Sequence, residues 1–292
     1  MMKSVMGKES FLKIQAVSDL HLETRAMADP LQMIKPVADV LIVAGDLGSF
    51  YDVSSLKDFL LKLCPHWKHV IYVPGNHEYY FHEKLEACAR SSQKTMSDLR
   101  WRARRELQKS IKNLHVLDRG LVRVEGVLFA GCTLWSNTRE LARLPCWVRT
   151  KLGVCNGAYL RMHHRDRKWL ERVLCENATE ELVVVTHYPP TFEALACPNE
   201  KFACLYANKL DGMIEARCVR AWIFGHTHRN FSRRCRRKDG SVVHVYSNPL
   251  GKSHDKCRMH PSHVIALPLK GDDRDDKKKC SPNFEKITSR DV

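Results

Sequence analysis

The chain has 292 residues, of which 44% are apolar and 28% charged, so it is long enough to bury the core of one large α/β domain. No apolar run approaches the roughly 18 residues that a membrane helix requires, and the first residues lack the apolar segment of a secretory signal. A formal net charge of +15 favours association with polyanions such as nucleotides, nucleic acid or phosphorylated surfaces.

Short apolar runs alternate with helical stretches along the chain, an order typical of α/β proteins. The sequence predicts strands at Lys13–Val17, Val40–Ala44, Val70–Val73, Val127–Ala130, Leu182–Val185, Ala221–Phe224, Val242–Tyr246 and His263–Leu267. It predicts helices at Val53–Leu63, Phe81–Lys112, His163–Cys175 and Leu205–Glu215. No helical pattern separates the last two strands, which indicates an antiparallel finish.

Two segments lack a regular pattern. Thr138–Asn156 is expected to be a surface insertion, and residues 271–292 combine mixed charge with few apolar side chains, as disordered tails do. Neither segment divides the chain. We therefore expect one domain over residues 11–270, followed by a tail over residues 271–292.

The positions of the cysteines indicate the redox state of the protein, and the positions of the basic residues indicate where its positive charge lies. Twelve cysteines are scattered from Cys64 to Cys280 without a close CxxC pair, so we expect reduced thiols in a cytoplasmic protein. Basic residues concentrate at 100–112 and 229–238. The first stretch is typical of a solvated helix face. The second is either a basic hairpin or a segment that steers an anionic substrate.

Five short blocks of potential metal ligands follow apolar runs, each where a strand is predicted to end. They are Ser18-Asp19-Leu20-His21, Gly45-Asp46, Gly75-Asn76-His77-Glu78, Thr186-His187 and Gly225-His226-Thr227-His228. The carboxyl ends of strands in an open α/β sheet share one crevice, so the blocks predict one common site. The glycines before the ligands predict sharp turns or close backbone approach.

The residue types in these blocks suit divalent cations. Asp19 and His21 are two residues apart at a strand end, a spacing that places both side chains on one face, and the same holds for His226 and His228. Asp46 offers a carboxylate that can bridge two ions. The mixture of Asp, Asn and His without Cys favours Mn, Fe, Zn or similar ions over a structural zinc site. Together the blocks favour a site that binds two metal ions and hydrolyses a phosphate ester.

In this order the blocks resemble the motifs of the calcineurin-like metallophosphoesterases: Asp-x-His, Gly-Asp, Gly-Asn-His-Asp/Glu, His and Gly-His-x-His. The resemblance runs from about Lys13 to Gly251. It implies a four-layer α/β/β/α sandwich, in which helices flank two mixed sheets. Two further stretches, Gly131–Trp135 and Ser247–Pro249, are similar to a bacterial-type subgroup of stand-alone phosphoesterases.

The resemblance also implies a role for each matching position. One metal would be held by Asp19, His21 and His228. The other would be held by Asn76, His187 and His226. Asp46 would bridge the two metals, and His77 would stabilise charge on the substrate or protonate the leaving oxygen. Glu78 would support its neighbours.

The chemistry implied is hydrolysis of a phosphate ester, most simply a diester, by direct attack of a hydroxide shared between two ions roughly 3.5–4 Å apart. No covalent phospho-enzyme is required. Mn²⁺ is the expected cofactor, with Fe, Zn, Ni or Co as alternatives. A nucleotide or another polyanion would suit the basic chain as substrate, whereas the sequence makes no prediction of oligomeric state.

Departures from better-defined subfamilies narrow this resemblance. Protein Ser/Thr phosphatases carry Asp-Arg-Gly shortly after Gly-Asp, but here the chain continues with 47–50, Leu-Gly-Ser-Phe. Purple acid phosphatases place a tyrosine ligand where this chain has Ser49, and Tyr51 is out of register. A repair nuclease would carry a longer chain, and no aromatic-interleaved basic strand supports nucleic-acid binding.

Three alternatives to a diesterase stay open: a phosphomonoesterase acting on proteins or small molecules, a nuclease, and a non-catalytic scaffold of the same fold. A scaffold is expected to lose metal ligands. The complete ligand set and the presence of His77 favour an enzyme.

Overall fold

Two stacked β-sheets form the centre of the computed structural model, which describes residues 11–25, 29–81, 95–198, 200, 202–253, 255 and 257–269. The first sheet has the order β11 (Val264–Pro268), β1 (Phe11–Val17), β2 (Val40–Ala44), β3 (His69–Val73) and β4 (Leu114–Val116). The second has the order β5 (Gly120–Val124), β6 (Val127–Cys132), β7 (Leu182–Thr186), β8 (Val219–Phe224), β10 (Val242–Ser247) and β9 (Phe231–Arg236).

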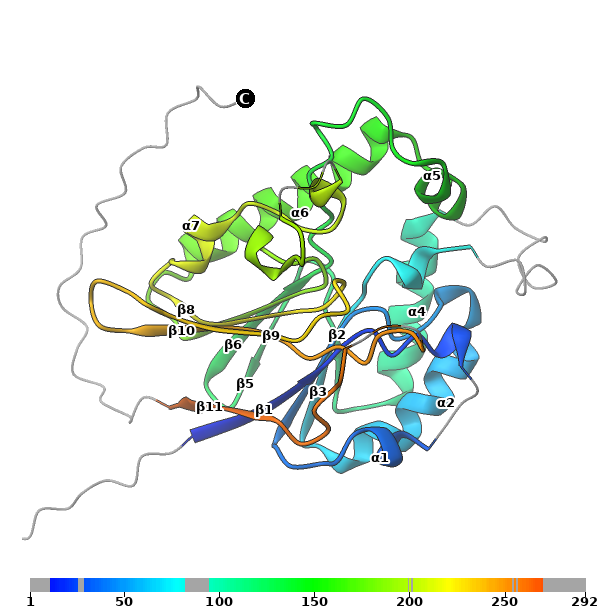
Figure 1. Cartoon of the computed structure of the whole chain (residues 1–292). Coiled ribbons are helices and arrows are strands. Elements are labelled where there is room, and N and C mark those ends of the chain that lie inside the picture. The colour runs from blue at the N-terminus through cyan, green and yellow to red at the C-terminus, as the bar shows by residue number, and fades with distance from the viewer. Residues whose placement is uncertain are drawn as a thin grey trace, which may run out of the picture.

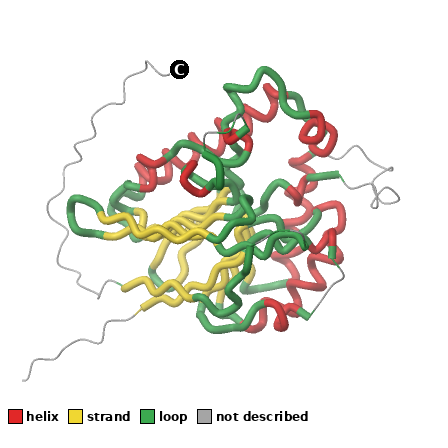
Figure 2. Tube along the Cα trace, viewed as in Figure 1, coloured by secondary structure: helices red, strands yellow, loops and turns green. Residues whose placement is uncertain are grey.

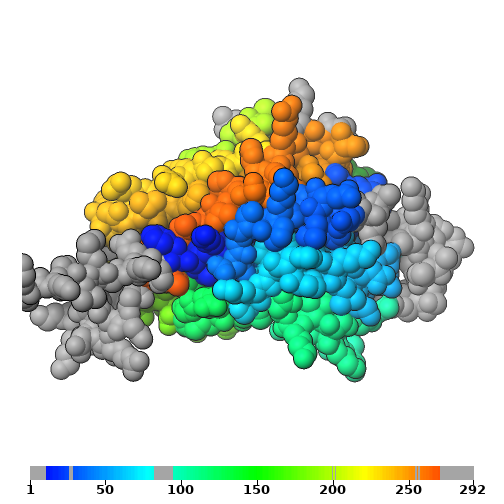
Figure 3. All heavy atoms as spheres, turned by 90° about the horizontal axis from the view of Figure 1, so that it is seen from below, coloured from blue at the N-terminus to red at the C-terminus, as the bar shows by residue number. Residues whose placement is uncertain are grey.

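Both sheets are mixed. Strands β1 to β4 are parallel, and so are β6, β7, β8 and β10. Antiparallel strands close the edges: β11 pairs with β1, β5 with β6, and β9 with β10. Figure 3 shows the segment that leads to β11 (orange) beside the N-terminal strand (blue), although the two are far apart in sequence.

Helices cover the outer faces of both sheets, which gives the four layers α/β/β/α (Figure 2). The helices are α1 (Pro30–Met33), α2 (Val53–Leu63), α4 (Met96–Ser110), α5 (Cys146–Leu152), α6 (Asn156–Glu176) and α7 (Asp211–Ile214). Helices α1, α2 and α4 lie on the first sheet, and α6 and α7 lie on the second (Figure 1). The expected fold class is confirmed.

Strand alternation explains why each central strand is apolar on both sides. In β2, Val40, Ile42 and Ala44 face the core between the sheets, while Leu41 and Val43 face the helices. Because both faces of the strand are covered, the run is buried throughout and shows no polar alternation.

Most predicted elements are present, and two are as predicted residue for residue: β2 and α2. Helix α2 begins where the Asp52 side chain accepts a hydrogen bond from the Ser55 amide. Among the described residues, the helix predicted at Phe81–Lys112 is α4, which spans Met96–Ser110 and begins at Thr95 with a capping box between Thr95 and Asp98. Residues 82–94 lie outside the described residues.

Two predictions need correction. The helix predicted at Leu205–Glu215 is wrong except for the single turn α7, because Asn208 instead ties this segment to the Leu134 carbonyl and the Asn137 amide. The segment Thr138–Asn156 contains α5, whose Val148 and Leu152 pack in the core beside the first sheet. Short elements went unpredicted: α1, β4, β5 and β9.

The antiparallel finish predicted for the last two strands is wrong for β10, whereas β11 pairs antiparallel with β1. Strands β10 and β11 do not pair with each other: they lie in different sheets, and β10 is parallel to β8. The tail predicted at 271–292 lies outside the described residues.

Candidate metal centre

Each ligand block forms a tight turn directly after its strand, so the blocks of both sheets meet at one end of the molecule. Many of the ligand residues adopt left-handed backbone angles: Asp19 (φ 56°), His21 (50°), Asp46 (51°), His226 (71°) and His228 (48°). This conformation costs an L-residue about 1–2 kcal/mol. Such strained positions cluster at functional sites, where the surrounding structure imposes them.

Two glycines allow the turns to approach each other. A Cβ on Gly75 would lie 2.3 Å from Asp46 Oδ1, and one on Gly45 would lie 2.3 Å from His187 Nδ1. Gly45 also has a φ of +85°. The predicted close approach at these glycines is confirmed.

The first cluster of ligand atoms comes from Asp19, His21, Asp46 and His228, whose candidate atoms lie within 4.8 Å of one another. The Nε2 atoms of His21 and His228 are 2.9 Å apart. His228 Nε2 also lies 3.4 Å from Asp19 Oδ1.

The second cluster is centred on His187, which is fully buried. Its Nε2 atom lies 2.9 Å from Asn76 Oδ1, 3.2 Å from His226 Nδ1 and 3.3 Å from Asp46 Oδ1. Four candidate ligands therefore surround one position.

Asp46 belongs to both clusters and turns one oxygen to each. Its Oδ1 faces His187 in the second cluster at 3.3 Å, and its Oδ2 lies 4.0 Å from His21 Nε2 in the first. The amide of His77 donates to Oδ1 at 2.8 Å and fixes the carboxylate in this orientation.

In three histidines, Nδ1 points away from the clusters and contacts an oxygen that can only accept a hydrogen bond. Nδ1 therefore carries a proton, and Nε2 of the same ring faces the clusters. The Nδ1 donors and their acceptors are His21 with Glu23, His187 with the Ala44 carbonyl, and His228 with Asp255. His226 presents Nδ1 instead, while its buried Nε2 has no partner among the described residues.

The electrostatics of the two clusters are strongly coupled. Burial opposes ionisation of Asp46, but His187 and His77 outweigh it and hold the pKa of this carboxyl well below its usual range. Burial likewise opposes charge on His228, yet Asp19 raises its pKa to about 9. Burial, together with the neighbouring His187, holds the pKa of His226 well below its usual range.

A pair of divalent ions fits this arrangement. The Nε2 atoms of His21 and His228 face each other at 2.9 Å beside ionised carboxylates, a contact that a shared proton satisfies and that a divalent cation would satisfy after displacing this proton. The donors are nitrogen and oxygen without sulfur, a set that suits Mn, Fe or Zn in a catalytic site. The clusters thus suggest a dinuclear divalent metal centre.

Next to the first cluster, His77 and Glu23 form a pair. The His77 ring lies edge-on to His21 at 4.4 Å and lines the cleft. Its Nδ1 donates to Glu23 Oε1 at 2.8 Å, the same oxygen that accepts from His21 at 2.9 Å. Burial opposes ionisation of Glu23, but these two histidines lower its pKa to about 2. Glu23 is thus a carboxylate that orients two imidazoles at once.

Glu78 braces the backbone and does not face the cleft. It accepts hydrogen bonds from the amides of Asp46, Leu47 and Gly75 and from the Tyr72 hydroxyl. This agrees with the supporting role expected for it.

The two subgroup segments brace the site as well. The Thr133 carbonyl accepts hydrogen bonds from the amides of His187 and Tyr188. Asn248 Nδ2 donates to the Ala16 carbonyl at 2.9 Å, just before the Asp19 turn. Both segments therefore hold ligand turns in place.

The clusters open into a cleft of about 710 Å³. Aromatic rings line it: Tyr80 is buried, whereas Trp147 and Tyr206 are 45% and 40% exposed and so present ring surface to a ligand. Cations line it too, namely Lys151, Arg229 and Lys252. The Lys151 ammonium lies 5.6 Å from the centre of the Tyr80 ring.

The structure brings together all eight residues singled out from sequence: Asp19, His21, Asp46, Asn76, His77, His187, His226 and His228. Sequence reasoning missed Glu23 and Asp255. An acidic residue two positions after His21 was a usable signal for the first. For the second there was none, because Asp255 follows His228 by 27 positions in an irregular segment.

The basic segment at 229–238 divides between two regions. Only Arg229 lines the cleft, and its guanidinium donates to the Leu195 carbonyl at 2.7 Å. The rest forms β9 and the turn that follows it, which run away from the site. The segment at 100–112 is mostly the exposed face of α4, as expected.

The site thus joins two stacked mixed sheets with paired clusters of candidate metal ligands at the carboxyl ends of the strands. A comparison with known families matches residues 12–230 to the calcineurin-like phosphoesterases. The chain belongs to this family, and its substrates are phosphate esters.

Individual relatives are distant. The "Uncharacterized protein L509" of Acanthamoeba polyphaga mimivirus is 25% identical over 283 residues, covering 87% of this chain and 96% of that protein. The phosphopantetheinyl hydrolase PptH from Mycobacterium tuberculosis is similar in structure, with a TM-score of 0.59, 16% identity, and coverage of 82% of this chain and 90% of that one. A dimetal phosphatase from Danio rerio has a TM-score of 0.43 at 16% identity, with coverage of 80% of this chain and 86% of that one.

Among the described residues, no helix combines the length and apolar character needed to cross a membrane.

Proposed function

We propose that this protein is a phosphodiesterase with a dinuclear centre, most simply of manganese. The observation that carries the proposal is the position of Asp46, whose two oxygens face two separate groups of imidazoles. Asp19, His21 and His228 would hold one ion. Asn76, His187 and His226 would hold the other.

When bound, two such ions supply an activated water and neutralise charge on the phosphate oxygens. The protein contributes the orientation of the ligands. The hydrogen bonds from the Nδ1 atoms, such as that of His187 to the Ala44 carbonyl, fix the orientation and tautomer of each ring in the absence of metal.

His77 is proposed as the general acid. Because Glu23 accepts a hydrogen bond from His77 Nδ1, the ring is held in one orientation at the wall of the cleft. A proton given to the leaving oxygen in this way contributes typically 10²–10⁴-fold to the rate. Glu23 is a positioning residue in this scheme, since it acts through His77.

The walls of the cleft support a diester with a planar group, such as a nucleotide. The exposed rings of Trp147 and Tyr206 offer stacking surfaces, and Lys151 offers a charge for an anionic oxygen. A diester needs room for two substituents, and the cleft of about 710 Å³ extends past the clusters to Leu195 and Ala203.

A phosphomonoesterase is the second candidate. The cations that line the cleft, Lys151, Arg229 and Lys252, would suit the extra charge of a monoester. The guanidinium of Arg229, however, is engaged by the Leu195 carbonyl. We also propose a cytoplasmic location, where the ten unpaired cysteines among the described residues would stay reduced.

The deciding experiment is a hydrolysis screen of the purified full chain with Mn²⁺, using bis(p-nitrophenyl) phosphate, p-nitrophenyl phosphate, cyclic nucleotides and single-stranded DNA. We expect the diesters to exceed the monoester by at least about tenfold in kcat/KM, a difference of about 1.4 kcal/mol. Chelation should abolish turnover, and Mn²⁺ should restore it. A monoester preference would select the second candidate, cleavage of single-stranded DNA would select a nuclease, and two bound metals without any hydrolysis would indicate a scaffold.

A further inference from the structure

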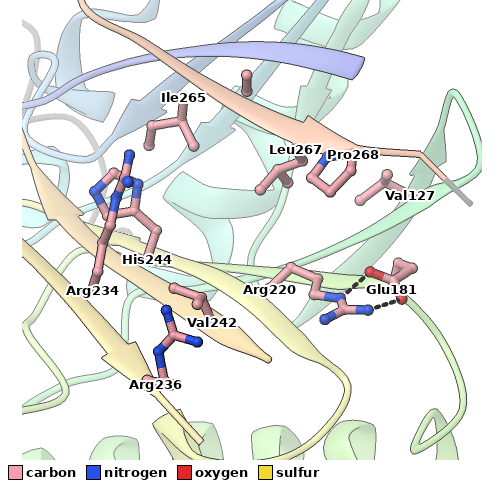
Figure 4. A pocket seen from close by; sticks show the side chains of 11 residues that line it. Val127, Glu181, Arg220, Arg234, Arg236, Val242, His244, Ile265, Leu267 and Pro268 are labelled. Carbon is pink, nitrogen blue, oxygen red and sulfur yellow. Dashed lines mark hydrogen bonds and ion pairs between the residues drawn. The ribbon is translucent and has the colours of Figure 1, made fainter. Parts of the chain in front are cut away.

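A second cavity, here called the distal pocket, lies at the other end of the parallel strands. It has a volume of about 530 Å³, within the range of roughly 300–1,000 Å³ that small-molecule sites occupy. Its walls come from β11 of the first sheet and from the starts of β6, β8 and β10 and the end of β9 in the second (Figure 4). The lining residues are Val127, Glu181, Arg220, Arg234, Arg236, Val242, His244, Ile265, Ala266, Leu267 and Pro268.

One part of the distal pocket is cationic. Arg234 and Arg236 are two residues apart on β9 and therefore share one face of the strand. Their register partners on β10 are His244 and Val242, which line the same pocket. Figure 4 shows both arginines and His244 on the side of the pocket formed by this hairpin.

The two arginines have no acidic partner among the described residues, in contrast to their neighbours. Arg220 is neutralised by both oxygens of Glu181, which is the acidic residue of the pocket lining. Burial and the nearby Arg234 lower the pKa of His244 to about 4, so this ring is neutral at pH 7 and the positive charge of this part comes from the two arginines.

The opposite part of the distal pocket combines an apolar wall with the Arg220–Glu181 ion pair, whose charges neutralise each other (Figure 4). Leu267 and Pro268 of β11 lie together with Val127 on the side away from Arg234 (Figure 4). Val242 is 39% exposed and forms apolar wall between the two parts. A hydrocarbon chain in this position would remove apolar surface from water.

We propose that the distal pocket binds an amphiphilic anion, namely an alkyl chain that ends in a carboxylate or a phosphate. The guanidinium groups of Arg234 and Arg236 suit a planar or multivalent oxyanion, which they can contact through several N–H donors. The apolar wall suits the chain. This inference is independent of the proposed function, because no residue of the distal pocket belongs to the metal centre.

The competing explanation is protection of a sheet edge. Strand β9 is the edge of the second sheet, and charged side chains on an edge strand hinder pairing with another chain. Edge protection requires charge alone and predicts no dependence on an alkyl chain.

Calorimetric titration of the full chain separates these explanations. The probes are decanoate, decyl phosphate, decanol and inorganic phosphate, each below the concentration at which micelles form. We expect the two anionic chains to bind at least tenfold more tightly than decanol or inorganic phosphate. Affinity should also rise by about twofold or more for each added methylene. The tighter of the two anionic chains identifies the head group.

Variants test the assignment of residues. Arg234→Gln combined with Arg236→Gln should weaken decanoate binding at least tenfold without changing the Tm. The matched control is Arg233→Gln, because Arg233 lies on the same strand but pairs with Glu193. The proposal is overturned if no probe binds, if inorganic phosphate binds as tightly as decanoate, or if the double variant binds normally.

Discussion

The metal centre and the distal pocket stand at opposite ends of the same strands, and they are built in different ways. At the carboxyl ends, the chain leaves each strand through a turn that places functional groups on strained backbone, as in Asp46 and His226. At the amino ends, the pocket is lined by residues that keep regular strand geometry, such as Arg234 and Val242.

This difference in construction has an energetic counterpart. In the metal centre nearly every polar atom is held by another one, so removing one group disturbs several; Glu23 contacts two histidines through one oxygen. In the distal pocket Arg234 and Arg236 have no acidic partner among the described residues, unlike Arg220, so we expect their replacement to leave the fold intact. Dense hydrogen bonding among polar side chains thus distinguishes the metal centre, where ligand positions must be exact, from the distal pocket.

The largest effect is expected at Asp46, where the two clusters join. Asp46→Asn should lower kcat by about 10³-fold or more, since loss of the bridging charge removes several kcal/mol of stabilisation from the transition state. Steady-state kinetics with a diester, together with metal analysis, measures this. The matched control is Asp239→Asn, on the exposed turn between β9 and β10, which should leave kcat unchanged. Full activity of the Asp46 variant with two metals bound would disprove the bridge.

His77→Ala should lower kcat by about 10²–10⁴-fold while both metals remain. The loss should be greatest for esters with poor leaving groups, because these depend most on protonation. Rates for a series of aryl diesters, with metal content determined in parallel, give the answer. His164→Ala, an exposed position on α6, serves as the control. An equal loss for every leaving group would rule out general acid catalysis.

Gly75→Ala tests whether close packing sets the ligand geometry. The added Cβ would lie 2.3 Å from Asp46 Oδ1 and 2.7 Å from His187 Cγ, so both ligands must shift. We expect metal affinity to fall by roughly 10–100-fold, as it does when groups that orient ligands are removed. Competition with a chelator measures this affinity. Gly212→Ala, where the Cβ meets open space, should bind metal normally, and normal affinity in both variants would contradict the packing argument.

Glu23→Gln should have a smaller effect, about tenfold on kcat, because the amide keeps the shape but loses the charge that orients His77. KM should stay close to its original value, whereas Tm should fall, because two buried histidines lose the carboxylate charge that both of them contact. The loss should follow leaving-group basicity, as for His77, whereas a purely structural role would slow all esters alike. Glu171→Gln, in an exposed ion pair on α6, is the matched control.

The same contrast explains what the sequence could predict. Buried strands such as β2 are continuous apolar runs, and the ligand turns carry residue types that few other roles require, so both were readable. Strand β9 was not, because an edge strand with the composition FSRRCR has no apolar alternation and its pairing with β10 supplies the structure. Helix α5 was also missed, although Pro145 and Gly153 mark its two ends.

Roles that depend on tertiary contacts were likewise beyond one sequence. Glu23 reaches His77 only because left-handed His21 begins a short 3-10 turn that folds the chain back. The helix predicted at Leu205–Glu215 failed for a similar reason. Its local propensity is outweighed by hydrogen bonds from Asn208 to segments about 70 positions away.

The smallest effect on turnover is expected at the far end of the strands. The Arg234→Gln and Arg236→Gln double variant should keep kcat within about twofold of the original, because no residue that lines the distal pocket is a candidate ligand or lines the cleft. The same preparation should lose its decanoate binding, so one sample reports on both ends. Addition of decanoate to the original protein should also leave kcat unchanged. A change in kcat on either test would show that the two ends are coupled through the strands, and the two regions would then have to be treated as one functional unit.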